Sequence, residues 1–211
     1  MKQYRMTRMR SVAFCSLLIL QPLSMQAIDR EGTCPTIKIT PERLPDLNIP
    51  RNAHSIANLN GEITVFGGHT DGFVSTPTAE YYKNGKWHLI KMIYNHDAGL
   101  ALPLSSGKVL LAGGFEKHLG IGQTFVAEMY DPHSHTFDGF GCMDKKRAHC
   151  TAVELDSGRV LITGNWYHDD AIEMFDGKDN FKFVKEVAQQ RSQPYVFRIS
   201  QSDVMIVNQI D

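Results

Sequence analysis

Apolar and polar residues alternate over short stretches of the chain, and no long stretch follows the 3.6-residue period of a helix. The clearest unit is an apolar run that ends at glycine: GEITVFGG at 61–68, GKVLLAGG at 107–114 and GRVLITGN at 158–165. Each run is followed by a loop, by a strand pattern with a central glutamate (79–82, 127–131, 172–176) and by one bulky aromatic residue (Trp87, Phe137, Phe181). The unit recurs roughly every 50 residues, and DVMIVNQ at 203–209 begins a fourth copy; short strands repeating at this interval are typical of a β-propeller.

Each unit predicts four antiparallel strands joined by hairpins, which is one propeller blade. Asn60-Gly61 and Asn84-Gly85 are strong hairpin signals because both residues tolerate a positive φ. The glycine-rich segment 115–123 is expected to be a long loop. The sequence therefore predicts an all-β fold with three complete four-stranded blades and a partial fourth, at about 51–93, 94–143, 144–187 and 188–211.

The repeated residues resemble the kelch repeat, including the kelch-type propeller of the galactose oxidase superfamily. Gly67-Gly68, Tyr81 and Trp87 match that pattern best; the second repeat has Phe137 for the tryptophan, and the third departs further at Asn165, Phe175 and Phe181. The resemblance implies that these glycines and aromatic residues bend the chain and fill the space between blades. A kelch propeller has more blades than this sequence contains, so we expect either a piece of a longer protein or a ring completed by oligomerisation.

The first residues predict export. Lys2, Arg5, Arg8 and Arg10 precede an apolar run at 12–20, and Ala27 suits signal-peptide cleavage. We therefore expect a signal peptide at 1–27, export to the periplasm or the medium of a bacterium, and no membrane span after cleavage. The proline-rich segment 28–50 is expected to be an extended lead-in along the surface, or a strand added to the last blade.

Charge and cysteine content narrow the partners. The formal net charge is -1, which disfavours nucleic acid as a ligand. Export permits disulfides, and Cys142 and Cys150 flank the junction of two repeats, so they are the candidate pair and Cys34 is left over. No cysteine spacing typical of zinc is present, and neither a metal nor a cofactor is predicted.

Two groups of residues are candidates for ligand binding. His54, His96 and His149 lie at or before the first strand of each repeat, with Arg51 and Arg147 just ahead of two of them. The favoured interpretation is that these residues cap the entry of each blade, and the alternative is that they contact a polar ligand in the central channel. A second group, Trp166, Tyr167 and His168, occupies a loop and is suited to stacking and hydrogen bonding.

The function that these patterns favour is an exported binding module for a protein or a glycan. Glu80, Glu128 and Glu173 recur at one position in every repeat, which favours a structural role over acid–base catalysis. Gly-x-Ser-x-Gly, His-Glu-x-x-His and phosphate-binding loops are absent, so no catalytic residue is assigned. Two alternatives stay open: part of a propeller enzyme acting on carbohydrate, of the oxidase or sugar epimerase/mutarotase type, or a truncated remnant without function.

Overall fold

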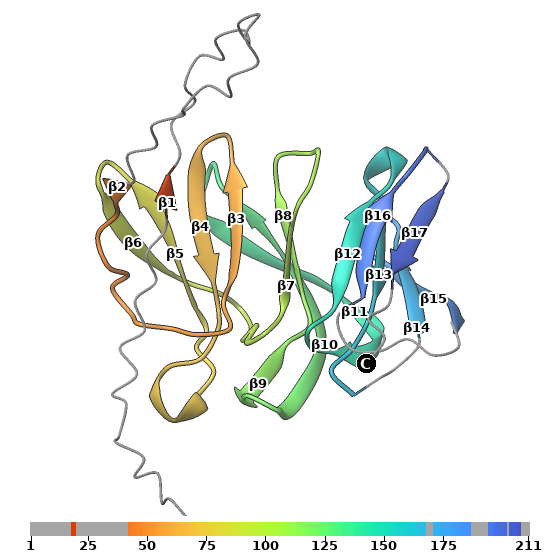
Figure 1. Cartoon of the computed structure of the whole chain (residues 1–211), viewed down its shortest axis with the longest axis horizontal. Helices are drawn as coiled ribbons and strands as arrows, with labels where there is room; N and C mark the ends of the chain where they lie inside the picture. The colour runs from red at the N-terminus through yellow and green to blue at the C-terminus, as the bar shows by residue number, and fades with distance from the viewer. Residues whose placement is uncertain (1–17, 20–41, 168–170, 187–193, 202, 208–211) are drawn as a thin grey trace, which may run out of the picture.

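The computed structural model describes residues 18–19, 42–167, 171–186, 194–201 and 203–207 (Figure 1). The predicted signal peptide, apart from the short strand β1 (Leu18–Ile19), lies outside these residues, as do Cys34 and His168. Strand β1 pairs with β2 (Glu42–Arg43). Within the described ranges the helical elements are two single 3₁₀ turns, η1 (Asp71–Phe73) and η2 (Asp156–Gly158), and no helix is long and apolar enough to cross a membrane.

Three antiparallel sheets, each with a path of four strands, and one two-stranded hairpin follow one another along the chain, as predicted; a fifth strand, β9 (Phe115–His118), is added to the second sheet. Blade 1 consists of β3 (Ser55–Leu59), β4 (Glu62–Phe66), β5 (Thr78–Lys83) and β6 (Lys86–Lys91). Blade 2 consists of β7 (Leu100–Pro103), β8 (Val109–Ala112), β10 (Ile121–Asp131) and β11 (Thr136–Arg147). Blade 3 consists of β12 (Thr151–Glu154), β13 (Val160–Thr163), β14 (Ala171–Phe175) and β15 (Phe181–Glu186), and the hairpin of β16 (Tyr195–Arg198) and β17 (Val204–Val207) begins blade 4.

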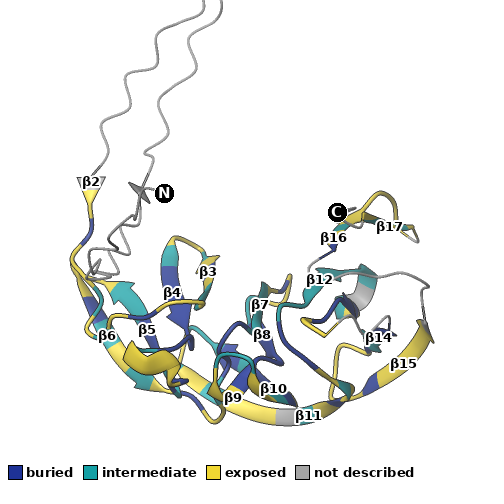
Figure 2. Cartoon of the chain, turned by 60° about the horizontal axis from the view of Figure 1, so that its bottom comes forward, coloured by how far each residue is buried: buried dark blue, intermediate teal, exposed yellow. Residues whose placement is uncertain are grey.

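The blades stand side by side in an arc (Figure 2). The first strand of each blade, β3, β7, β12 or β16, lies on the concave side, and the fourth strands β6, β11 and β15 lie on the convex side. Apolar side chains fill the space between neighbours: Phe66 and Ala79 of blade 1 pack with Leu111 and Tyr130 of blade 2. The next interface joins Leu104, Leu110 and Met143 of blade 2 to Ile162 and Phe175 of blade 3, so the core is a series of inter-blade layers.

The tight ends of the second strands explain the repeated glycines. Gly67 has φ +60°, and a Cβ there would lie 2.6 Å from the carbonyl oxygen of His96 in the next blade. Gly113 is equivalent: its φ is +66°, and its Cβ would lie 2.5 Å from the carbonyl oxygen of Arg147. A side chain fits neither the backbone conformation nor the available space, so glycine is required where consecutive blades meet.

The end of the lead-in segment covers the outer face of blade 1. Leu44 packs with Ile63, Val65 and Trp87, and the indole Nε1 of Trp87 donates to the carbonyl oxygen of Pro45 at 2.8 Å. This contact buries the side of blade 1 that faces away from blade 2. The lead-in is therefore more than the surface segment that its prolines suggested, because its described part supplies core residues.

The prediction that segment 115–123 is a loop was wrong. Strand β9 (Phe115–His118) pairs with the start of β10, which makes a hairpin that extends blade 2 at one end of the molecule (Figure 1). Phe115 is fully buried, so it anchors the hairpin, while Gly120 at the turn and Gly122 at a register irregularity in β10 both have positive φ values. The glycines were interpreted as loop residues, whereas they belong to the hairpin.

The predicted disulfide is also not formed. Cys142 and Cys150 are both free thiols. Cys142 lies in β11, the outermost strand of blade 2, opposite Val126 of β10. Cys150 directly precedes β12, the innermost strand of blade 3, so the intervening chain carries the two thiols to opposite sides of the sheets. Their closeness in sequence was therefore misleading.

Candidate binding site

A buried contact between an arginine or histidine and a glutamate, which we call the clasp, repeats in every complete blade. Arg51 Nη2 lies 2.8 Å from Glu80 Oε1 in blade 1, and Arg147 Nη2 lies 2.8 Å from Glu173 Oε1 in blade 3. In blade 2 the ring nitrogen His96 Nε2 lies 3.0 Å from Glu128 Oε1. All six side chains are buried. Arg51, His96 and Arg147 also reach the carbonyl oxygens of the glycines that end the second strands: Arg51 to Gly67 at 2.9 Å, His96 to Gly113 at 2.6 Å and Arg147 to Gly164 at 3.2 Å.

The clasp removes three candidates from the list of ligand-contacting residues. Arg51, His96 and Arg147 are at most 2% exposed and are bonded within their own blades, which agrees with the favoured interpretation that they cap the blade entry. His96 occupies the place of the two arginines, so it is not equivalent to His54 and His149. Ala53, Ala98 and His149 all have positive φ values, so these three residues occupy equivalent positions in the three blades.

Those three equivalent residues join the blades around the axis through their backbones. The amide of Ala98 donates to the carbonyl of Ala53 at 2.9 Å, and the amide of His149 donates to the carbonyl of Ala98 at 2.8 Å. The side chains of His54 and His149 line a cavity of about 390 Å³ at this point, together with Thr151 and Tyr195. The structure thus brings two of the three predicted histidines together at one cavity.

Burial sets the protonation of these two histidines. Burial lowers the pKa of His54, and the positive charge of Arg51 lowers it further. Burial also lowers the pKa of His149, although the carboxylate of Asp97 opposes that change. Both imidazoles are therefore neutral at pH 7, and each offers one donor and one acceptor nitrogen.

Beside the cavity, blade 2 carries an acidic residue that the other blades lack. Asp97 is fully buried; its Oδ1 lies 2.9 Å from His69 Nδ1, and its Oδ2 accepts a hydrogen bond from the Ser75 hydroxyl at 3.3 Å. Burial raises the pKa of Asp97, and the hydrogen bond from His69 counteracts part of that effect. These contacts fix the loop 70–76 of blade 1 against blade 2, so Asp97 is a positioning residue.

The backbone around Asp97 repeats while the side chains change. Asn52 exchanges backbone hydrogen bonds with His69, Asp97 accepts from the amide of Phe115, and Ala148 accepts from the amide of Trp166. The same geometry therefore presents His69, Phe115 and Trp166 at one position of three blades. The backbone geometry at this position is the same in the three blades but the side chains differ, so the blades differ in their chemistry at this position.

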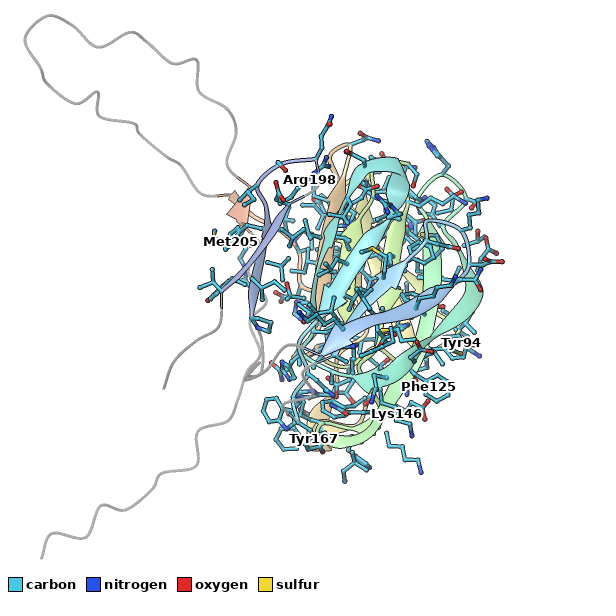
Figure 3. The ribbon with its side chains drawn as sticks, turned by 90° about the vertical axis from the view of Figure 1, so that its right-hand side faces the viewer. Tyr94, Phe125, Lys146, Tyr167, Arg198 and Met205 are labelled. Carbon is cyan, nitrogen blue, oxygen red and sulfur yellow. The ribbon has the colours of Figure 1, made fainter. Side chains whose placement is uncertain are left out.

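Four large apolar side chains stand exposed on the loops at this end of the molecule, and we call them the loop face. They are Phe73 (59% exposed), Ile121 (59%), Trp166 (44%) and Tyr167 (57%). Figure 3 shows Tyr167 at one end of the molecule with Lys146 and Phe125 nearby, and the Nζ of Lys146 lies 5.9 Å from the ring centroid of Phe125.

Hydrogen bonds between blades hold the loop face together. The amide of Leu119 donates to the carbonyl of Phe73 at 3.2 Å, which joins the loop of blade 1 to the β9–β10 hairpin. The hydroxyl of Tyr167 donates to the carbonyl of Gly120 at 2.6 Å, which joins the loop of blade 3 to the same hairpin. Trp166 packs on His149, with ring centroids 4.7 Å apart. The loop face is therefore continuous with the cavity.

Sequence reasoning named Trp166, Tyr167, His54, His149 and His69 as candidates but did not name Phe73, Ile121 or Asp97. The two apolar residues that it missed lie in loops where a single hydrophobic residue gives no periodic signal. Asp97 could have been identified by comparing the repeats position by position, because the other two repeats have Asn52 and Ala148 in its place. Among the described residues, no group of three or more histidine, cysteine or acidic side chains is placed to bind a metal.

No family model matches the chain. An F-box/kelch-repeat protein of Arabidopsis thaliana is 24% identical over 139 residues, which are 65% of this chain and 36% of that protein. Among solved structures, YjhT superposes with a TM-score of 0.65 at 13% identity, over 86% of this chain and 63% of the other. The chain thus spans about a third of the curated relative's length, and both likenesses agree with the repeat seen in the sequence and the structure.

Proposed function

We propose that this kelch-type β-propeller is a binding module that holds a protein partner on its loop face. The observation that supports this most is that Phe73, Ile121, Trp166 and Tyr167 come from the loops of three different blades and stand exposed on one continuous surface. Exposed apolar side chains gathered in this way mark interaction sites. Aromatic residues in particular are enriched among those that contribute most to protein–protein binding.

The cross-links between the loops support the proposal further. Because backbone and side-chain hydrogen bonds connect the loop of blade 1, the β9–β10 hairpin and the loop of blade 3, little conformational entropy is lost when a partner binds. The cavity lined by His54 and His149 adjoins the same surface, and its two neutral imidazoles give it a polar wall. The apolar contacts then give the partner its affinity, and contacts with the two histidines fix its orientation on the loop face.

The proposal is tested with peptides selected from a random display library on the immobilised chain. Binding of the selected peptides is measured by titration calorimetry with the unaltered chain, with Trp166→Ala and with the control Leu89→Ala, whose side chain is equally exposed but lies on β6. We expect Trp166→Ala to weaken binding at least about tenfold, as loss of an aromatic anchor does, and the control to bind normally. If every selected peptide binds Trp166→Ala normally, the loop face is not the binding site.

A carbohydrate ligand is the second candidate, and one observation favours it. The indole of Trp166 packs on His149 at the edge of a cavity lined by His54 and Thr151, an arrangement that can stack on a sugar ring and bond its hydroxyls. A glycan array probed with the same two variants separates the candidates, because a glycan signal lost in Trp166→Ala would favour this second function. A catalytic role in carbohydrate chemistry would require turnover of the bound glycan.

Export of the protein is part of the proposal. The basic residues and apolar run within 1–27 support it, and the expected cleavage follows Ala27. Expression of the full chain in a bacterium, followed by N-terminal sequencing of the periplasmic fraction, tests it. A mature protein starting at Ile28 is the expected result, and an unprocessed chain confined to the cytoplasm would contradict export.

A further inference from the structure

Blade 2 closes its clasp with a different kind of residue from its neighbours. Blades 1 and 3 use Arg51 and Arg147, whose guanidinium groups keep their charge throughout the physiological pH range, whereas blade 2 uses His96. Histidine is the side chain whose charge changes most readily near neutral pH. All three residues lie four positions before the first strand of their blade, so the backbone is equivalent and only the chemistry of the contact differs.

The contacts of His96 require one more proton than a neutral imidazole and a carboxylate ion hold together. Nδ1 lies 2.6 Å from the carbonyl oxygen of Gly113, which can only accept, so Nδ1 carries a hydrogen. Nε2 lies 3.0 Å from Oε1 of Glu128, and among the described residues neither of these buried atoms has another hydrogen-bond partner. Without a further proton, the lone pair of Nε2 would face a carboxylate oxygen, and the contact would be repulsive. A proton on either atom makes the contact attractive, so this proton belongs to the pair.

Glu128 receives fewer hydrogen bonds than the equivalent glutamates. The carboxylates of Glu80 and Glu173 each accept from two backbone amides and from an arginine. In the described part of the chain, Glu128 accepts from one backbone amide, that of Ile93 at 3.0 Å, in addition to its contact with His96. Both side chains of the pair are at most 1% exposed, so water does not replace the missing donors. A buried carboxylate with so few donors depends strongly on the shared proton.

The other charged groups packed around His96 have partners of their own. They are Asp97 on the same segment, paired with His69; Arg51 of blade 1, paired with Glu80; and Arg147 of blade 3, paired with Glu173. Tyr94, the remaining titratable residue of the segment 93–99, lies against Gly139 on the outer strand β11. The protonation of His96 and Glu128 is therefore set mainly within the pair.

We propose that the pair of His96 and Glu128 makes blade 2 sensitive to pH. One shared proton keeps the entry segment 93–99 closed on Glu128, and loss of that proton as the pH rises releases the segment. The stabilisation is complete while the pair is protonated and disappears on deprotonation, so the loss of local stability falls on the alkaline side. The clasps of blades 1 and 3 have no such step, because arginine does not deprotonate in proteins.

Release of the entry segment also reaches the loop face. Asp97, the residue next to His96, holds the loop 70–76 through its contacts with His69 and Ser75. That loop carries one of the exposed aromatic side chains of the loop face. Alkaline pH should therefore loosen the loop of blade 1 together with the entry of blade 2.

Hydrogen exchange of the full chain between about pH 6 and about pH 9 tests the proposal, read as protection factors so that the intrinsic pH dependence of exchange cancels. Two variants remove the need for the shared proton. His96→Arg installs the clasp of blades 1 and 3, and Glu128→Gln supplies an amide that donates to a neutral imidazole. In the unaltered chain, protection of residues 93–99 should fall at least about tenfold across this range, and that of the loop 70–76 should fall with it. In both variants protection should change less than about twofold.

Two controls separate this effect from a general response to pH. Residues 144–148, which enter blade 3 with an arginine clasp, should keep their protection in every sample. His118→Arg, which adds a charge on the exposed side of β9, should lose protection at 93–99 as the unaltered chain does.

Three results would overturn the proposal: an equal loss of protection at the entries of blades 2 and 3, a loss in Glu128→Gln as large as in the unaltered chain, or no loss at all. A loss at 93–99 without one at 70–76 would overturn the link to the loop face. Glu128→Gln and the entry of blade 3 keep the test decisive even if His96→Arg does not fold.

Discussion

At the scale of single residues, each blade closes around one buried glutamate. The carboxylate of Glu80 accepts hydrogen bonds from the amides of Asn48 and Ile49 at 2.7 and 3.0 Å, in addition to Arg51. Glu173 accepts equivalent bonds from the amides of Asp144 and Lys145. Each of these carboxylates thus connects three parts of the blade: the segment that leads into it, the arginine at its entry and its third strand.

The substitution Glu173→Gln is expected to destabilise the protein by about 3–5 kcal/mol, because it leaves the buried guanidinium of Arg147 without a counter-charge. Urea unfolding followed by intrinsic fluorescence measures the loss. The matched control is Glu116→Gln on the exposed side of β9, which should change the unfolding free energy by less than about 0.5 kcal/mol. Similar losses for the two variants would mean that the clasp contributes little.

The structural role of these glutamates could be predicted from the sequence because they recur in every repeat. The role of His96 could not, since the blade entries were aligned on histidine. In that alignment His96 matches His54 and His149, whereas the backbone aligns it with Arg51 and Arg147. Identity of residue type was a poorer guide than distance to the following strand: the clasp residue lies four positions before β3, β7 and β12 alike.

At the scale of elements, the strands were easier to predict than the loops. The second strands are mostly apolar segments of four or five residues, and the hairpins at Asn60-Gly61 and Asn84-Gly85 form with both residues at positive φ as expected. The β9–β10 hairpin gave no such signal, because its strand residues Glu116, Lys117 and His118 are polar and exposed. Its stability comes from contacts with a loop far away in the sequence, which local patterns do not record.

Asp97→Ala should loosen the loop at 70–76 without unfolding the blades. The substitution removes the contacts of Asp97 with His69 and Ser75, so we expect hydrogen exchange in this loop to accelerate about tenfold, which corresponds to about 1.4 kcal/mol of local stability. Exchange mass spectrometry measures this directly. Asp71→Ala, an exposed change in the same loop, should leave the rates unchanged; if it accelerates exchange equally, Asp97 is not what holds the loop.

At the scale of the whole molecule, the repeat predicts the order and number of the blades in this sequence. It does not predict that the lead-in segment covers the outer face of the first blade. Prolines suggested that segment 28–50 runs along the surface. In the structure, the amide of Asn48 donates to Glu80 as that of Ile93 donates to Glu128 and that of Asp144 to Glu173. Leu47 therefore takes the place that Met92 and Met143 take at the later junctions, and the lead-in stands in for the last strand of a preceding blade.

Leu44→Ala tests whether this covering segment stabilises the whole arc. Leu44 is buried against Ile63, Val65 and Trp87, so its truncation should lower the free energy of unfolding by about 2 kcal/mol. Leu89→Ala, which removes the same atoms from an exposed position on β6, should cost less than about 0.5 kcal/mol. Equal midpoints for Leu44→Ala and the unaltered chain in chemical denaturation would show that blade 1 does not depend on the lead-in.

The backbone bonds that link Ala53, Ala98 and His149 have a consequence for how such a site changes over evolution. Because these bonds join main-chain atoms, they do not depend on the side chains at the three positions, and substitutions there can alter the lining of the cavity while the bonds remain. The cavity can therefore acquire new recognition chemistry one residue at a time, much as an antibody loop does on its constant framework. Function in this molecule can diverge fastest at the place where its architecture is most repetitive.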